Sequence, residues 1–242
     1  MKKIAFVLLA FISFSTANAQ LKPKKDWSKV KIDRAGDHLM LQLSSDHLGG
    51  APDSINSRTK GLSRGLNFYV MLNKPFKSDP RLSVAFGVGI STSGIFFNKT
   101  SIGVNALGTT VLPFTNLDSS NYFKKYKLAT SYLEAPIELR YTFDPENEDK
   151  SWKVAIGIKV GTMLDAHTKG KTLLNKTGGT INSYTEKESK SSFFNSTRLS
   201  GTARVGIGHF SLFGAYSITS FLKDGAGPII RPYQIGIALS GL

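Results

Sequence analysis

The sequence predicts an all-β protein, an eight-stranded antiparallel up-and-down transmembrane β-barrel with short periplasmic turns and long outer loops. In residues 82–90, 152–161 and 233–239, large apolar side chains alternate with small or polar residues. Successive side chains of a strand point to opposite faces, so each segment has one apolar face. No later stretch approaches the ~20 apolar residues of a membrane-spanning helix, so a membrane-bound chain has to form a closed barrel.

The chain begins with the features of an exported protein. Lys2 and Lys3 precede a short apolar run and the small residues of Ala17-Asn18-Ala19. This pattern predicts a signal peptide over residues 1–19, cleaved near Ala19. Residues 20–36 follow as a basic periplasmic N-terminal tail, and residues 37–242 form the barrel. The chain has no cysteine, which excludes disulfides and thiolate chemistry.

The eight strands are justified in chain order by length and by the residues on each face. Most have the ~9–11 residues that a tilted strand needs to cross the hydrocarbon layer. They are expected at 37–45, 64–72, 81–93, 130–143, 151–165, 197–207, 209–221 and 232–242. The third, fifth and eighth strands supply the predicted lipid-facing residues Val84, Phe86, Val88, Val154, Ile156, Ile158, Ile235 and Ile237.

The connections between these strands alternate in length. Residues 73–80, residues 144–150 and the junction at Gly208 are short, and the other four connections are longer. Outer-membrane barrels have short periplasmic turns and long outer loops, so this alternation of short and long connections supports eight strands. Aromatic residues near the strand ends predict two interfacial girdles: Phe143, Trp152 and Phe210 on the periplasmic side, and Phe96, Tyr132, Phe221 and Tyr233 on the outer side.

The opposite strand faces carry a few charged residues among Gly, Ala and Ser. We expect an ion cluster that fills the lumen, formed by Glu134, Glu138, Arg140, Lys159 and Arg204 together with Gln42 and Asn67. A Lys or Arg on lipid near the midplane would cost ~2–4 kcal/mol, which fixes this orientation. A soluble lipocalin-like barrel is the structural rival, but its outer face would be dense in Lys, Glu and Thr. Pro136 cannot donate to a ladder, so a bulge or bend is expected there.

One segment resembles a known family. Residues 131–141 read S-Y-L-E-A-P-I-E-L-R-Y, and this segment resembles a strand of the PorT-like outer-membrane β-barrel proteins of Bacteroidetes. Residues 37–43, residues 61–72 and Pro75-Phe76 are similar to the opening strands of that group. The resemblance implies an eight-stranded barrel in the outer membrane of a Gram-negative bacterium. It supplies no activity, although the founding member is linked to protein secretion.

The net charge of +14 bears on partners. The basic residues are spread over tail, loops and lumen without a nucleic-acid-binding motif, and the chain is exported, so nucleic acid is discounted. Loop lysines are expected to meet outer-membrane lipid and lipopolysaccharide phosphates. They are Lys99, Lys124, Lys125, Lys127, Lys169, Lys171 and Lys176.

Catalysis is not expected. Asp165 and His167 would share a strand face at the outer rim, where a carboxylate could orient an imidazole as a general base. No nucleophile motif, metal-ligand spacing or phosphate loop accompanies them, and no cofactor or metal is predicted. The sequence therefore favours a monomeric, non-enzymatic barrel with a structural or surface-interaction role. The alternatives are an accessory factor in secretion or envelope assembly, which would have a protein partner, and a rim-located hydrolase or acyltransferase.

Overall fold

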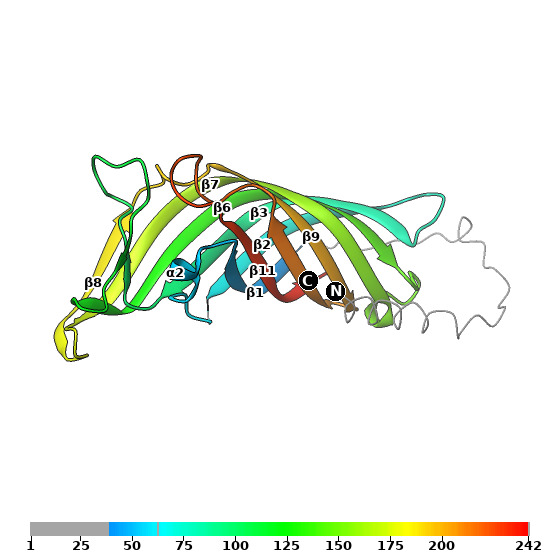
Figure 1. The fold of residues 1–242 in the computed structure, drawn as a ribbon. Coiled ribbons are helices and arrows are strands. Elements are labelled where there is room, and N and C mark those ends of the chain that lie inside the picture. The colour runs from blue at the N-terminus through cyan, green and yellow to red at the C-terminus, as the bar shows by residue number, and fades with distance from the viewer. Residues whose placement is uncertain (1–38, 62, 242) are drawn as a thin grey trace, which may run out of the picture.

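The computed structural model describes residues 39–61 and 63–241, which form a closed barrel of eight antiparallel strands. This confirms the predicted fold class. The strands are β1 (Leu39–Gly49), β2 (Arg64–Pro75), β3 (Leu82–Phe97), β6 (Tyr122–Thr142), β7 (Trp152–Leu174), β9 (Thr197–Ile207), β10 (Phe210–Ser217) and β11 (Arg231–Ser240). Each strand pairs with its neighbours along the chain, β1 pairs with β11, and β6 pairs with β7 (Figure 1). The expected signal peptide (1–19) and basic tail (20–36) lie outside the described residues.

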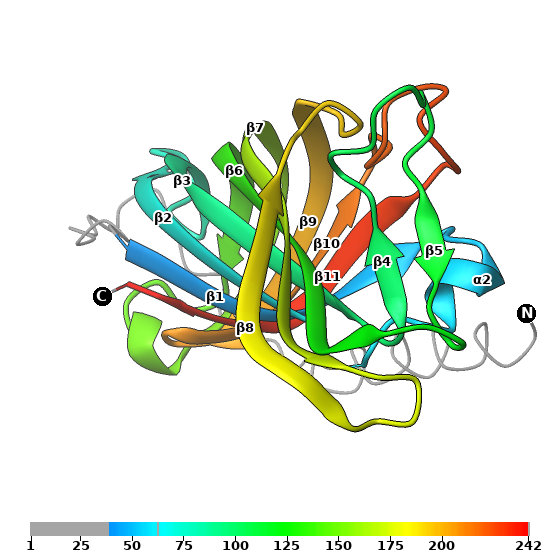
Figure 2. The same ribbon diagram turned by 90° about the vertical axis from the view of Figure 1, so that its left-hand side faces the viewer.

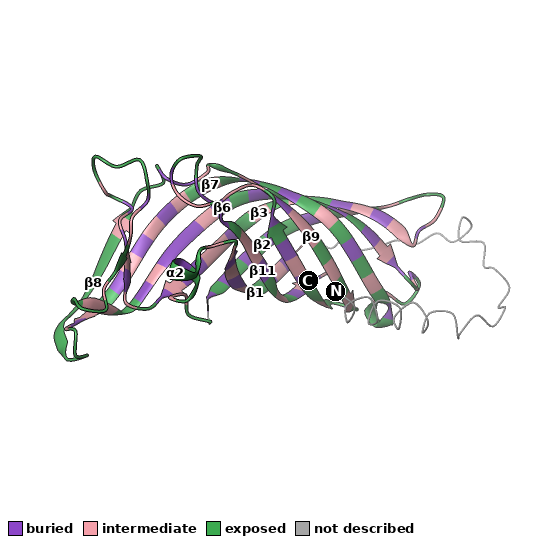
Figure 3. Cartoon of the chain, in the orientation of Figure 1, coloured by how far each residue is buried: buried purple, intermediate pink, exposed green. Residues whose placement is uncertain are grey.

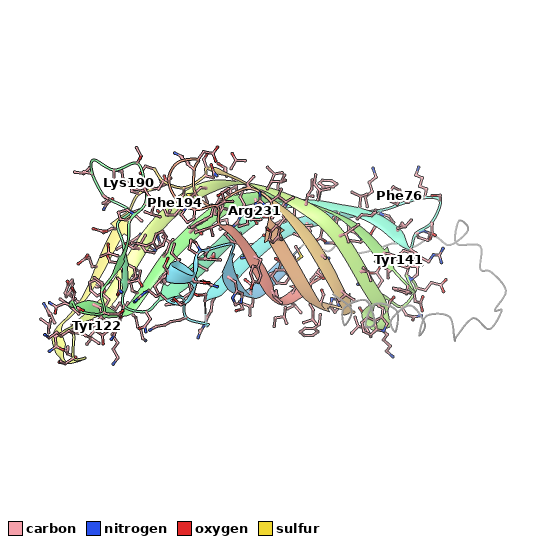
Figure 4. The ribbon with its side chains drawn as sticks, in the orientation of Figure 1. Phe76, Tyr122, Tyr141, Lys190, Phe194 and Arg231 are labelled. Carbon is pink, nitrogen blue, oxygen red and sulfur yellow. The ribbon has the colours of Figure 1, made fainter. Side chains whose placement is uncertain are left out.

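The two ends of the barrel differ as the loop lengths predict. One end has tight connections, including the 3-10 turn η2 (Glu148–Lys150) and a turn at Gly208, whose φ of 56° suits glycine. The other end carries helix α2 (Asp53–Asn56), the small hairpin of β4 (Thr100–Ile102) and β5 (Phe114–Asn116), and strand β8 (Thr180–Ser189) (Figure 2). Figure 4 shows Phe76 and Tyr141 at the first end and Tyr122 at the second. Within the described residues, no helix has the length and apolar character needed to cross a membrane.

The wall of the barrel alternates between exposed apolar and buried small or polar residues (Figure 3). Phe86, Ile156 and Ile235 lie on the outer surface with 46%, 60% and 60% of their area exposed. The other predicted lipid-facing residues share this surface, and Val84 is half-buried on it. Because a soluble protein rarely exposes a continuous apolar band, this surface fits contact with hydrocarbon.

A β-bulge in β7 changes which side chains face outward. Tyr132 pairs with Met163 and Ser131 pairs with Asp165, so Leu164 is an extra residue between the two pairs. Above the bulge, Ala166 and Thr168 are buried, while their neighbours in the strand are more exposed. The bulge thereby brings the odd-numbered residues from 165 to 171 to the outside of the barrel, although odd-numbered Lys159 points into the lumen.

A bulge or bend is expected at Pro136, and the strand pairing shows no bulge there. Pro136 pairs in register with Lys159, and β6 keeps one register with β3 on both sides of Pro136. The ladder with β3 is only interrupted, opposite Gly87 and Val88. The missing N–H therefore removes a local ladder bond without displacing the strand.

Two residues assigned to the outer aromatic girdle are instead buried. Tyr132 is 2% exposed and shares the lumen-facing side of β6 with Glu134. Phe221 is 8% exposed and packs on Phe194 in an apolar cluster beneath the outer loops, here called the outer cap. The periplasmic residues Phe143, Trp152 and Phe210 are more than half exposed, which fits a girdle. The buried members of the outer cap include Leu48, Ile55, Phe97, Ile102, Tyr126, Leu128, Phe193, Phe194, Leu222 and Ile230.

Candidate functional site

The lumen holds a buried ionic group around Glu134, here called the Glu134 cluster. The Glu134 carboxylate is 1% exposed. It accepts hydrogen bonds from Arg198 Nε at 3.0 Å and from the Tyr69 hydroxyl at 2.5 Å. Lys159 Nζ lies 3.4 Å from the same carboxylate and donates to the Tyr69 oxygen at 3.2 Å. The Arg198 guanidinium also stacks on the Tyr132 ring, 3.8 Å from its centroid.

A second group, the Glu138 cluster, lies nearer the short turns. One Glu138 oxygen accepts from Arg140 Nε and from Arg204 Nη2, both at 2.9 Å. Arg204 also donates to Ser211 and Ser240, on the two strands that follow it in the barrel. The structure thus divides the five charged residues of the predicted cluster between two groups, centred on Glu134 and Glu138, four residues apart on β6.

Amide side chains continue the network toward β1 and β11. Arg198 donates to Ser91, which donates to Asn67, and Asn67 donates to Gln42 at 3.1 Å. Asn67 also reaches Gln234, whose amide donates to the buried carboxylate of Asp46. Hydrogen bonds of this kind satisfy polar groups that would be costly to bury alone.

These networks leave little open space in the lumen. The cavities beside Arg140 and beside Asp46 each measure about 20 Å³, close to the volume of one water molecule. Above them, the outer cap fills the mouth with apolar side chains. Among the described residues, no group of His, Asp or Glu could hold a metal ion.

The sequence prediction missed Arg198, Tyr69 and Asp46. Arg198 is an even number of residues from Arg204 on the same strand, and Asp46 is an even number of residues from Gln42. Such residues point to the same face of a strand, so alternation alone could have placed Arg198 and Asp46 in the lumen. Tyr69 lies two residues from Asn67 on β2, so the same alternation also points it into the lumen, although an aromatic residue by itself fits a lipid-facing position equally well.

A sheet projects beyond the barrel mouth, formed by residues 122–131 of β6, residues 165–174 of β7, and β8. Lys127, Lys169 and Lys187 are direct cross-strand partners in one row. Lys125 and Lys171 form the next pair on the same side. These five residues are here called the lysine face. Glu186 is paired with Gly170, which puts it on the opposite side of the sheet.

The lysine face concentrates like charges. Burial, followed by repulsion from Lys169 and Lys171, lowers the pKa of Lys127. Lys127 also lies over the Phe96 ring at 5.9 Å, so its stem packs on an aromatic residue. Directly opposed like charges destabilise a sheet, so this arrangement favours an anionic ligand that would relieve the repulsion.

The expected Asp165 and His167 pair is formed, and no hydroxyl of the described residues donates to its imidazole. His167 Nδ1 lies 2.6 Å from an Asp165 oxygen. Ser189 donates to the other Asp165 oxygen at 2.7 Å instead of approaching the imidazole. In a catalytic Ser-His-Asp triad the imidazole lies between the serine and the carboxylate, whereas here the Asp165 carboxylate lies between Ser189 and His167. A different pair, unforeseen from the sequence, joins Ser45 Oγ and His47 Nε2 at 3.0 Å on the outer surface of β1.

A comparison with protein families agrees with this architecture. The family model described as outer membrane protein beta-barrel domain matches residues 19–222. No curated protein matches. Among solved structures, the chain is similar to Ail, the attachment invasion locus protein of Yersinia pestis, at 12% identity and a TM-score of 0.32. That similarity covers 84% of this chain and 95% of Ail. The family match covers most of the sequence: the chain belongs to the outer membrane protein β-barrel domain family, and its barrel lies in the outer membrane.

Proposed function

We propose that this protein is a non-enzymatic surface-interaction barrel whose lysine face binds phosphate groups of lipopolysaccharide. The filled lumen serves as a rigid anchor and the projecting sheet as the binding element. The observation that carries the proposal is the set of five lysines on one side of three paired strands, Lys125, Lys127, Lys169, Lys171 and Lys187.

The height of the lysine face fits this ligand. Leu133 and Leu164 are outward-facing apolar residues, 41% and 55% exposed, below the projecting sheet. Lys127 lies six residues further along β6, which is about 20 Å along the strand and about 14 Å in height for a strand tilted near 45°. Phosphates of the outer-leaflet headgroups would lie in this zone, above the hydrocarbon and beside the barrel wall.

The test compares two triple variants of the full chain in neutral detergent micelles, titrated with lipopolysaccharide. Lys127→Gln, Lys169→Gln and Lys187→Gln remove one row of the lysine face. Lys74→Gln, Lys77→Gln and Lys150→Gln remove three exposed charges at the other end. At ~1 kcal/mol for each cation near an anionic surface, the first variant should bind about 100-fold more weakly, and the control should match the wild type. Equal affinities of the two variants would refute the proposal.

We further infer that the chain is a PorT-like barrel of a Bacteroidetes species, exported by a signal peptide cleaved near Ala19. The strand over 131–141 and the basic, apolar start of the chain support this inference. N-terminal sequencing of the protein from washed outer membranes would give Gln20 as the first residue. An intact Met1 would contradict it.

A second candidate role, as an accessory factor with a protein partner, is favoured by β8. This strand pairs with β7 on one edge only within the described chain, and nearly all of its side chains are exposed. A free strand edge can accept a strand from another protein. A photocrosslinking residue at Ser183 should capture such a partner in intact cells. The same residue at Lys77, in a short turn, is the control, and equal capture at both sites would count against this role.

A further inference from the structure

An apolar groove of about 830 Å³ crosses the outer wall of the barrel. It is lined by residues of β6, β7, β9, β10 and β11, among them Ile137, Ile158, Gly201, Gly214 and Tyr233. Ligand-binding clefts have volumes of ~300–1,000 Å³, so the groove is large enough for part of a lipid. It belongs to none of the lumen clusters and lies apart from the lysine face.

The floor of the groove is formed by outward-facing small residues that the barrel itself does not require. A Cβ atom on Gly201 would meet nothing within 4 Å, and one on Gly214 only the Gln234 carbonyl at 3.9 Å. In contrast, a Cβ on lumen-facing Gly236 would overlap the backbone of β1. Gly201 and Gly214 therefore create space on the lipid side, whereas Gly236 gives room to a neighbouring strand.

The groove follows two register rows that climb obliquely toward the outer rim. One row joins Ile137, Ile158, Gly201, Tyr216, Tyr233 and His47 as successive cross-strand partners. The row beside it joins Leu139, Ile156, Ala203, Gly214, Ile235, Ser45 and Arg64. Followed around the barrel through Gly94, this second row returns to β6 at Ala129, well above Leu139. This stagger makes the groove rise from the middle of the wall to the ends of β1 and β2.

The upper end of the groove is polar and basic. His47 stacks on Tyr233 at 5.0 Å and shares a hydrogen bond with Ser45. The exposed side chain of Arg64 is the cross-strand neighbour of Ser45. On the other side of β1, exposed Arg231 lies two residues from Tyr233 on the same face of β11 (Figure 4). An apolar groove thus leads into a site with two guanidinium groups and two further hydrogen-bonding side chains.

We propose that this groove binds one phosphate-bearing lipid of the outer leaflet, with an acyl chain along Gly201 and Gly214 and the phosphate between Arg64 and Arg231. The wall faces hydrocarbon, so an acyl chain is the material that fills the hollow, and an empty hollow would forfeit dispersion contacts. The cations at the upper end complement a phosphate and lie at the level of the headgroups. This site does not depend on the lysine face.

The experiment uses the full chain in vesicles that contain phosphatidylglycerol with a photoreactive group in its acyl chain. Crosslinked residues are mapped by mass spectrometry. Labelling should concentrate on residues 201–203 and 214–216, several-fold above the lipid-facing residues 86–90 of β3. The variant with Gly201→Leu and Gly214→Leu should bring this labelling down to the β3 level. The matched control with Val205→Leu and Leu212→Phe adds bulk to the same strands outside the groove and should leave it unchanged.

The headgroup contact is tested by comparing labelling by two photoreactive lipids with the same acyl chains, one a phosphatidylglycerol and the other a phosphatidylcholine. Arg64→Gln should lower the preference for phosphatidylglycerol about fivefold, the effect expected for one cationic contact, whereas Lys60→Gln in the neighbouring loop should not. Uniform labelling around the barrel would overturn the proposal. So would an equal loss of labelling in the variant with Gly201→Leu and Gly214→Leu, here called the filled variant, and in the control variant. So would a dimer in vesicles that the filled variant abolishes, because a second copy would then occupy the groove. None of these results depends on lipopolysaccharide binding by the lysine face.

Discussion

Removal of the Glu134 carboxylate should destabilise the barrel more than any other single charge change in the lumen. Glu134→Gln keeps the side-chain shape but leaves Lys159 and Arg198 without their counter-charge. Lys159 Nζ lies 3.4 Å from the carboxylate, and its side chain is 4% exposed. At an effective dielectric constant near 20, two charges at that distance interact by about 5 kcal/mol. Loss of one partner from a buried pair typically costs ~3–5 kcal/mol, so we expect a loss of that size.

The assay is reversible urea unfolding in phospholipid vesicles, followed by tryptophan fluorescence. Trp152 is 58% exposed on the barrel wall and should report loss of the lipid environment. Glu186→Gln on exposed β8 is the matched control, with an expected change within about 0.5 kcal/mol. The double variant with Glu134→Gln and Lys159→Met should be less destabilised than the sum of its parts by ~1–3 kcal/mol. If Glu134→Gln unfolds at the same urea concentration as Glu186→Gln, the lumen cluster does not have the role described.

Three further predictions follow from the wall, the lumen and the loops. Ile156→Lys should lower the free energy of unfolding by ~2–4 kcal/mol in the same vesicle assay, because it places a charge against lipid. Ile181→Lys on exposed β8 should lower it little. Equal losses in the two variants would contradict the orientation of the barrel wall. Gly89→Ala should destabilise the barrel by ~1–3 kcal/mol, because the new Cβ would lie 2.6 Å from Tyr69 Cα. Gly201→Ala should leave the stability unchanged, because its Cβ would meet no atom within 4 Å. A larger loss in Gly201→Ala than in Gly89→Ala would contradict this difference between the two glycines. The Arg58 hydrogen bond lowers the pKa of Asp118 from 3.8 to about 2, so its stabilisation of the outer loops is present above pH 3.8 and is lost as the pH falls toward 2. Near pH 4, pepsin should therefore cleave these loops faster in Asp118→Asn than in the wild type. Near pH 2 the two proteins should be cleaved at the same rate. A difference in cleavage rate that persists near pH 2 would count against this ion pair.

The parts of the fold that could be predicted from sequence are the strands in which apolar residues occur at every second position. Alternation in residues 82–90 and 152–161 fixes which side of β3 and β7 meets lipid, and the same parity selects Glu134 and Lys159 for the lumen. The bulge at Leu164 could not be predicted, because one extra residue leaves no mark in composition yet reverses the facing of all residues that follow.

The outer half of the molecule was harder to predict for a related reason. Strand β8 is polar on both sides, so it has no alternation to detect, and its place beside β7 depends on pairing. The outer cap joins Leu48 and Phe97, at the outer ends of β1 and β3, to Phe194 in the loop before β9, and such long-range packing carries no local signal. The lysine face depends on both features, since the bulge turns Lys169 outward and β8 places Lys187 beside it. The lysines themselves were visible in the sequence, but their common surface was not.

The most direct test of the membrane placement is a spin-label scan of residues 153–159 in vesicles. The chain has no cysteine, so each single-cysteine variant carries one label. Collision rates with oxygen, which partitions into hydrocarbon, should peak at Val154, Ile156 and Ile158 and fall at the residues between them. Peaks at those three positions for a water-soluble nickel reagent instead, or a profile without a two-residue period, would contradict a barrel whose outer wall faces lipid.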